Sequence, residues 1–160
     1  MEQQLVVFSL GKEEFGVDIS RVREIVRLHN ITAIPQSAEF VEGLVNLRGQ
    51  IVPIVDLCKR FLMSEKTDRE NAAEQRIIVL HIQERSIGIL VDGVSEILRI
   101  ADESIEPPPP IVANSVGAEF IRGIAKVADR LIVMLDLERM FSSEEQDVFE
   151  AAVENAAAVG

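Results

Sequence analysis

The alternation of apolar and polar residues predicts a β-hairpin over residues 40–57. Two short apolar runs, 44–47 and 51–57, flank the polar turn Arg48-Gly49-Gln50. Runs of this kind around a glycine-containing turn are typical of antiparallel strand pairs. Pro53 lies in the second run and cannot donate to a ladder, so we expect it at a sheet edge, at a bulge or facing out of the sheet.

The same pattern returns at an offset of 80 (120 − 40), over residues 120–137. The Phe, the Gly and the closing Asp-Leu are identical in the two copies, and most other positions exchange one aliphatic residue for another. A second correspondence, at an offset of 72 (77 − 5), relates residues 5–28 to residues 77–100. Two aligned blocks in the same order indicate an internal duplication.

The tip of the hairpin is where the copies differ. The apolar alternation survives in both, but Asn46, Arg48 and Gly49 are replaced by other residue types in the second copy. The fold alone therefore does not demand the Asn-Leu-Arg-Gly segment. Two interpretations stay open: a plain surface turn, or interaction residues held at a turn tip by a rigid scaffold.

Each copy offers four or five short strands with frequent turns and no long helix between them, which predicts an all-β fold. Several strands that close on themselves remove their edges, so we expect two small β-barrels packed together. The first would span about residues 1–70 and the second about 76–141, joined by a charged linker over 64–75. Whether the barrels exchange strands is not fixed by the sequence.

Two further segments depart from the strand pattern. The second copy has a longer internal connection, residues 101–119, where four consecutive prolines favour a polyproline II course outside either sheet. After residue 141 the pattern changes to an acidic C-terminal helix or tail over 142–160, in which Ser142 and Glu145 have the spacing of a capping box. Its apolar positions recur at three and four, and we expect that stripe to dock against a barrel.

Composition narrows the classes of partner. The 160 residues are 48% hydrophobic, enough for a substantial core, and carry a net charge of −11. That charge disfavours nucleic acid, which is bound by basic surfaces, and the chain lacks the Tyr and Trp on which single-stranded bases stack. Because the N-terminus has no signal-peptide pattern and no apolar run is long enough to span a bilayer, we expect a cytoplasmic protein without direct membrane insertion.

Candidate catalytic residues are few. Cys58 is the single cysteine, and His29 and His81 lack metal-ligand spacing, so no metal or cofactor is expected. We interpret Cys58 as a packed thiol and His81 as lying on an outer strand face. Asp56 and Asp136 occupy equivalent positions at strand ends, which fits caps better than a catalytic carboxylate pair. These interpretations favour a binding protein over an enzyme.

The residues that carry most of this pattern resemble those of a known family. They are Phe15-Gly-Val-Asp-Ile-Ser-Arg-Val-Arg-Glu-Ile25, the stretch Gly43–Leu57 with its Asn-Leu-Arg-Gly segment, and Val91-Asp-Gly-Val-Ser-Glu-Ile97. Together they resemble the CheW family of bacterial chemotaxis coupling proteins, over about residues 5–141. The resemblance implies two five-stranded barrels of the Src-homology-3 type, in agreement with the duplication.

The resemblance also implies a non-catalytic scaffold that couples the cytoplasmic hairpin of a chemoreceptor to the histidine kinase CheA, at membrane-associated receptor arrays. Residues implied on the receptor side are Val22, Glu24, Asn46, Arg48, Gly49 and Ile97. Ile97 and its repeat mate Ile25 would line a groove between the copies. The kinase regulatory domain would meet the loop before the second hairpin, at Glu106, Pro110 and Ile111.

Two alternatives remain beside this interpretation. One is a CheW-like adaptor of a non-chemotaxis pathway, such as surface motility or diguanylate cyclase control. The other is a double barrel that binds or converts a small molecule, which predicts convergent polar groups in a concave pocket, whereas a scaffold predicts an apolar groove.

Overall fold

The protein is seen here as a computed structural model, which describes residues 2–11, 13–27, 31–32, 41–57, 74–82, 84–108 and 120–140. The described residues form mostly short strands, as the sequence predicts. In chain order the elements are β1 (Glu2–Leu10), β2 (Glu13–Asp18), the 3₁₀ turn η1 (Ile19–Arg21), β3 (Val22–Arg27), β4 (Val41–Leu47), β5 (Gln50–Asp56), β6 (Arg76–Ile82), β7 (Arg85–Val91), β8 (Gly93–Ala101), the 3₁₀ turn η4 (Asp102–Ser104), β9 (Ile105–Glu106), β10 (Ile121–Val127), β11 (Arg130–Leu135) and α3 (Leu137–Met140).

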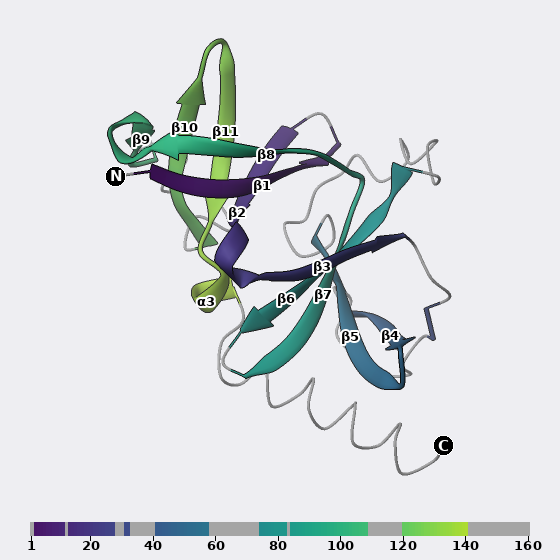
Figure 1. The fold of residues 1–160 in the computed structure, drawn as a ribbon. Coiled ribbons are helices and arrows are strands. Elements are labelled where there is room, and N and C mark those ends of the chain that lie inside the picture. Colours follow the sequence, from purple (N-terminus) through teal and green to yellow (C-terminus); the bar gives the residue numbers. More distant parts are fainter. Residues whose placement is uncertain are drawn as a thin grey trace.

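The strands make two sheets, which confirms the all-β prediction (Figure 1). One sheet, here called sheet A, has the order β8-β1-β2-β11-β10-β9, and the other, sheet B, has the order β3-β6-β7-β5-β4. Sheet A lies above sheet B in Figure 1, and η1 connects them where the chain passes from β2 to β3.

Each sheet combines strands from both copies of the repeat. In sheet B, β5 runs parallel to β7 with Ile54 opposite Gly88, and in sheet A, β11 runs parallel to β2 with Met134 opposite Gly16. These pairings are equivalent under the two repeat offsets, so the duplication extends to the register. The ranges 1–70 and 76–141 thus separate the copies in sequence, whereas each sheet draws on both.

Both sheets close in the same way. The chain leaving β3 at one edge of sheet B reaches β4 at the other edge, where Thr32 and Leu44 exchange two backbone hydrogen bonds of 2.9 and 2.8 Å. In sheet A the chain leaves edge strand β8, turns through η4 and pairs as β9 with β10, with Glu106 opposite Ile124. Each closure carries the chain from one edge of its sheet to the other and pairs part of the strand there.

The predicted hairpins are confirmed in both copies, with turns of two residues. Leu47 pairs with Gln50 across Arg48-Gly49, so Gln50 already belongs to the strand. Pro53 is buried in an inner strand rather than at an edge. The position is tolerated because pairs alternate along the ladder, which makes Leu44–Pro53 a pair without hydrogen bonds between its members, and the ladder with β7 begins only at Ile54.

The core has three parts. Sheet B encloses a cluster that includes Ile54 and Ile77, and sheet A encloses one that includes Leu5 and Ile132. A larger cluster, which includes Phe8, lies between the sheets and draws side chains from both. β1 and β6 are therefore buried on both faces, which explains why their sequences are continuous apolar runs rather than alternating ones.

Several predictions lie outside the described residues. They concern His29, Cys58, the helix over 142–160 and most of the linker over 64–75. Within the described ranges, no helix has both the length and the apolar character needed to cross a membrane.

Candidate functional site

The tip of the β4–β5 hairpin has a conformation that few residue types adopt. Arg48 and Gly49 have φ angles of 52° and 84°, as in the left-handed turns that connect two-residue hairpins. The amide of Gly49 donates to Asn46 Oδ1 at 2.9 Å, which fixes the turn from within. A Cβ at Gly49 would meet nothing within 4 Å, so the glycine serves the backbone conformation rather than close packing.

Arg48 projects from this tip into solvent and contacts the edge strand β3. Its Nη2 pairs with Glu24 Oε2, while 77% of the Arg48 side chain stays exposed, against 26% for Glu24. β3 has a bulge between Val22 and Glu24, and a bulge re-aims the side chains beside it. The predicted residues Val22, Glu24, Asn46, Arg48 and Gly49 thus lie on one strand edge and the hairpin tip that closes against it.

A hollow of about 300 Å³ lies between β3 and the hairpin. Glu24 and Arg48 line it together with the buried Val52 and Val79. Charged side chains therefore line this hollow above two buried apolar ones.

The Glu24–Arg48 pair should add little to folding stability. Glu24→Gln is expected to change the free energy of unfolding by less than about 1 kcal/mol, because exposed ion pairs gain little over solvation. Urea denaturation of the two proteins measures the difference. A loss above about 2 kcal/mol would show that the pair is structural.

Ile97 is the one residue predicted for the receptor side that lies on sheet A. Ile97 lies on β8 of sheet A, with 54% of the residue exposed, and its repeat mate Ile25 is 39% exposed on β3 of sheet B. Both are large apolar residues at the same position of equivalent edge strands. That they line one groove stays a prediction.

The predicted kinase-side residues are described only in part. Glu106 is exposed and belongs to the short strand β9 rather than to a loop, and its carboxylate pairs with Lys126 Nζ at 3.1 Å. Pro107 and Pro108 follow it outside any strand, because proline lacks the amide that would extend the ladder. Pro110 and Ile111 lie outside the described residues.

A second arginine cluster was missed by the reasoning from sequence. Arg130, at the base of the β10–β11 turn, binds Glu14 on β2 and Glu96 on β8, each at 2.5 Å. These contacts raise the pKa of the Arg130 guanidinium above its usual value. The hydrogen bond to Glu14 has the largest effect and the one to Glu96 the second largest. The repeat contains an indication of this cluster, because Glu96 occupies the position in the second copy that Glu24 occupies in the first.

The remaining candidates have structural positions. Asp136 caps α3, since its Oδ1 accepts from the amide of Arg139 at 3.2 Å, and Asp56 is buried at the equivalent strand end. His81 is exposed on β6, as predicted. In the part of the chain that the structure describes, no three His, Cys, Asp or Glu residues are placed to hold a metal ion.

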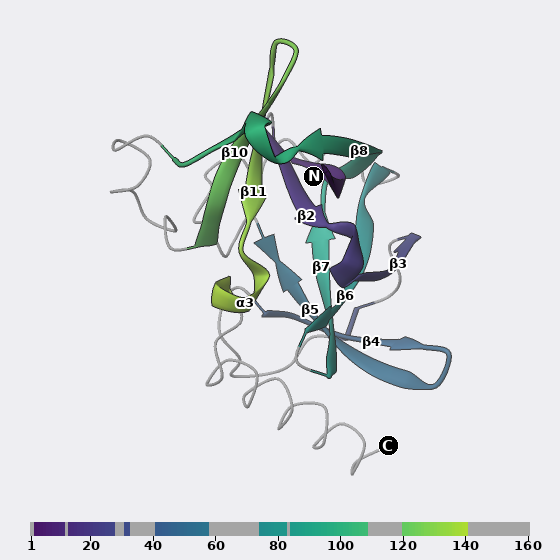
Figure 2. The same ribbon diagram turned by 60° about the vertical axis from the view of Figure 1, so that its left-hand side comes forward.

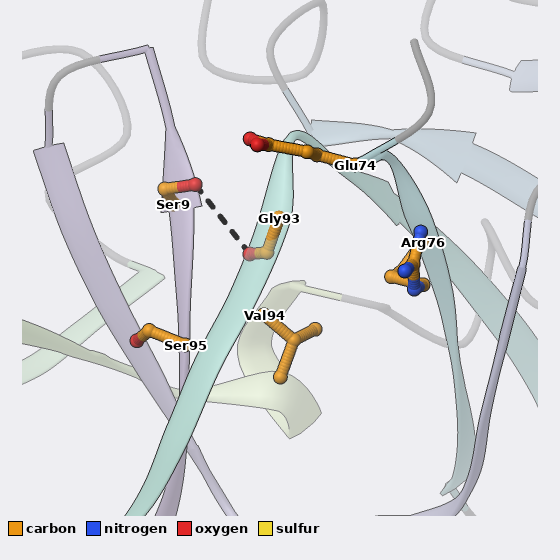
Figure 3. A pocket seen from close by; sticks show the side chains of 6 residues that line it. All are labelled: Ser9, Glu74, Arg76, Gly93, Val94 and Ser95. Atoms are coloured by element: carbon orange, nitrogen blue, oxygen red, sulfur yellow. Dashed lines mark hydrogen bonds between the residues drawn. The ribbon is translucent and has the colours of Figure 1, made fainter. Parts of the chain in front are cut away.

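A polar hollow of about 410 Å³ lies where β1, β6 and β8 meet (Figure 3). Its hydroxyls are engaged by the protein: Ser9 Oγ donates to the carbonyl of Gly93 at 3.5 Å, and Ser95 Oγ donates to that of Val7 at 3.2 Å. The Glu74 carboxylate and the Arg76 guanidinium lie apart and do not converge on a common point. This arrangement does not favour a small-molecule site.

Two interlocked barrels, each built from both copies of the repeat, define a double-barrel protein with an exposed arginine at one hairpin tip. Comparison with known proteins gives its family. A model of the CheW-like domain matches residues 4–145. The chain is 38% identical over 155 residues to the chemotaxis protein CheW of Klebsiella aerogenes, covering 97% of this chain and 89% of that protein.

Other relatives agree. The chain is 35% identical over 144 residues to the chemotaxis protein CheW of Treponema pallidum, covering 89% of this chain and 84% of that protein. The crystal structure of the scaffolding protein TtCheW from Thermoanaerobacter tengcongensis superposes with a TM-score of 0.80 at 40% identity, covering 91% of each chain. The chain belongs to the CheW family of chemotaxis proteins, and it is a non-catalytic scaffold.

Proposed function

We propose that this chain couples the cytoplasmic hairpin of a chemoreceptor to the regulatory domain of the histidine kinase CheA. The observation that carries the proposal is the exposed Arg48 at the tip of a hairpin whose turn is held by the Asn46 side chain. Among its described contacts the guanidinium uses one nitrogen, Nη2, so its other donors can meet a carboxylate of a partner. The family resemblance supplies the class of partner.

The receptor side of the proposed surface consists of Val22, Glu24, Asn46, Arg48 and Gly49, with Ile97 on the other sheet. A receptor helix that carries an acidic residue beside an apolar stripe fits this surface. Arg48 would bind the carboxylate, and the apolar side chains would pack into the hollow. In the unbound chain Glu24 holds Arg48. A partner carboxylate would therefore compete with Glu24 for the guanidinium.

The kinase side of the proposal is the region from Glu106 to Ile111. Glu106 supports it by being exposed at the start of the proline segment, with Lys126 beside it. Pro110 and Ile111 enter the proposal from the resemblance alone. Prolines in sequence would lose little conformational freedom on docking. We also propose that residues 1–141 form the functional unit, followed by an acidic helix or tail, and that the protein acts in the cytoplasm at receptor arrays.

The proposal is tested by binding of the full chain to two purified fragments from the organism that encodes it. These are the CheA regulatory domain and the cytoplasmic tip of a chemoreceptor. We expect each to bind separately and both to bind at once, because the Arg48 hairpin tip lies on sheet B whereas Glu106 lies on sheet A. Analytical ultracentrifugation measures the complexes, and a chain that captures neither fragment would contradict the proposal.

A further inference from the structure

Both sheets have the same arrangement at one edge strand, a bulge followed by a glutamate that binds an arginine. β3 has its bulge between Val22 and Glu24, and the ladder of β8 with β1 shifts register between Val94 and Glu96. In both strands the glutamate that follows the bulge binds an arginine from the hairpin that closes the same sheet. The bulged edges of the two sheets are thus each tied to a hairpin by one ion pair.

The two ion pairs differ in how many carboxylates the arginine binds and in how exposed its side chain is. Among the described residues, Arg48 meets one carboxylate and its side chain is 77% exposed, whereas Arg130 meets two and its side chain is 35% exposed. Its Nη2 and Nε meet the two oxygens of Glu14 at 2.5 and 3.3 Å, and its Nη1 meets Glu96 at 2.5 Å. The planar guanidinium fork suits this bridge between two carboxylates, and a lysine would not reproduce it.

Arg130 connects the edge strand β8 to the inner strands of sheet A. β8 is an edge strand, so it is held by a ladder on one side only, and its register shift interrupts that ladder beside Glu96. The Arg130 bridge ties β8 at this point to β2 and β11, across the intervening strand β1. Ile97 follows Glu96 directly, and successive side chains of a strand alternate in direction. Fixing Glu96 therefore fixes the orientation of the exposed Ile97.

We propose that Arg130 is a positioning residue that holds the bulged edge of β8, and through it the exposed Ile97, in the conformation that a protein partner contacts. The role of Ile97 in partner binding rests on the proposed function. The holding of β8 does not, because it follows from the contacts within the chain. The two parts can therefore be tested separately.

Hydrogen exchange tests the first part without any partner. In Arg130→Met, which keeps the alkyl length and removes the charge, amides of residues 94–98 are expected to exchange about tenfold faster, the factor for losing about one charge-assisted hydrogen bond. Amides of β3 should not change. Arg139→Met is the matched control, because Arg139 is 70% exposed on α3 with one loose ion pair at 3.8 Å. Unchanged exchange in β8, or equal acceleration in β3, would overturn the proposal.

A double-mutant cycle tests the second part with a receptor-tip fragment as the probe. If Arg130 acts through Ile97, then Arg130→Met and Ile97→Ala will each weaken binding, and the double variant will be weakened no more than the stronger single one. Arg130→Met combined with Arg48→Ala should instead multiply the two effects. Multiplicative effects with Ile97→Ala would overturn the positioning role.

Glu96→Gln keeps the question answerable if Arg130→Met does not fold. It preserves the volume of the side chain and removes one charge of the bridge, so it should show the same pattern in weaker form. If the wild-type chain binds no receptor fragment, the proposed function fails, while exchange at residues 94–98 still decides whether Arg130 fixes β8.

Discussion

Gly43→Ala is expected to destabilise the protein by about 3–5 kcal/mol, the range for strained backbone combined with a steric clash. Gly43 has φ of 152°, and a Cβ there would lie 2.2 Å from the carbonyl oxygen of Thr32. That oxygen cannot yield, because it accepts from the amide of Leu44 in the bridge that closes sheet B. Chemical denaturation followed by circular dichroism measures the loss.

The repeat supplies the matched control. Gly123 occupies the same position of the second hairpin, but a Cβ there would lie 3.0 Å from the carbonyl oxygen of Glu106, and its φ is not positive. Gly123→Ala should therefore cost no more than about 1–2 kcal/mol, as for a small overpacking change. Equal losses for the two variants would show that closure of sheet B does not depend on the close approach at Gly43.

The sequence predicts the elements of this fold well because the duplication gives each pattern twice. Both hairpins and the burial of the apolar runs follow from alternation and turn chemistry, whereas the first turn was predicted with three residues and has two. The position of Pro53 differs from the expectation that it lies at a sheet edge. Its place in an inner strand depends on the phase of the hydrogen-bond ladder, and that phase follows from a turn length of two residues rather than three.

The exchange of strands between the two copies could not be predicted from the sequence, for a physical reason. Ile54 opposite Gly88 and Met134 opposite Gly16 are equivalent pairs in the two copies. Local pairing energies are therefore similar whether a hairpin pairs within its own copy or with the other. The choice depends on the connections and on the shared core between the sheets, where side chains from both copies, such as Phe8 and Ile78, pack together.

The contacts around Arg48 could be predicted from the sequence only in part. The exposure of Arg48 follows from its place in a polar turn, but its pairing with Glu24 depends on closure of the sheet, which brings residues 24 positions apart together. The Arg130 bridge was missed because the repeat alignment places Ala128 opposite Arg48. The second copy keeps its arginine two positions later, where it meets a second carboxylate from Glu14.

Arg48→Ala is expected to leave the fold intact and to weaken binding of a receptor-tip fragment about tenfold to hundredfold, the cost of losing one charge-assisted contact at an interface. The free energy of unfolding should change by less than about 1 kcal/mol, because the side chain is exposed and its one described ion pair is at the surface. Calorimetric titration measures the binding, and kinase activity in reconstituted arrays measures the coupling.

Arg139→Ala separates this effect from a general loss of positive charge. Arg139 is similarly exposed, at 70%, but lies on α3, and Figure 2 shows that α3 is far from the tip of the β4–β5 hairpin. In a chain with net charge −11, removing either cation changes the long-range field by the same amount. A deficit confined to Arg48→Ala would therefore come from contact at the tip. Unchanged kinase activation by that variant would mean that the hairpin is a plain surface turn and that the receptor is held elsewhere.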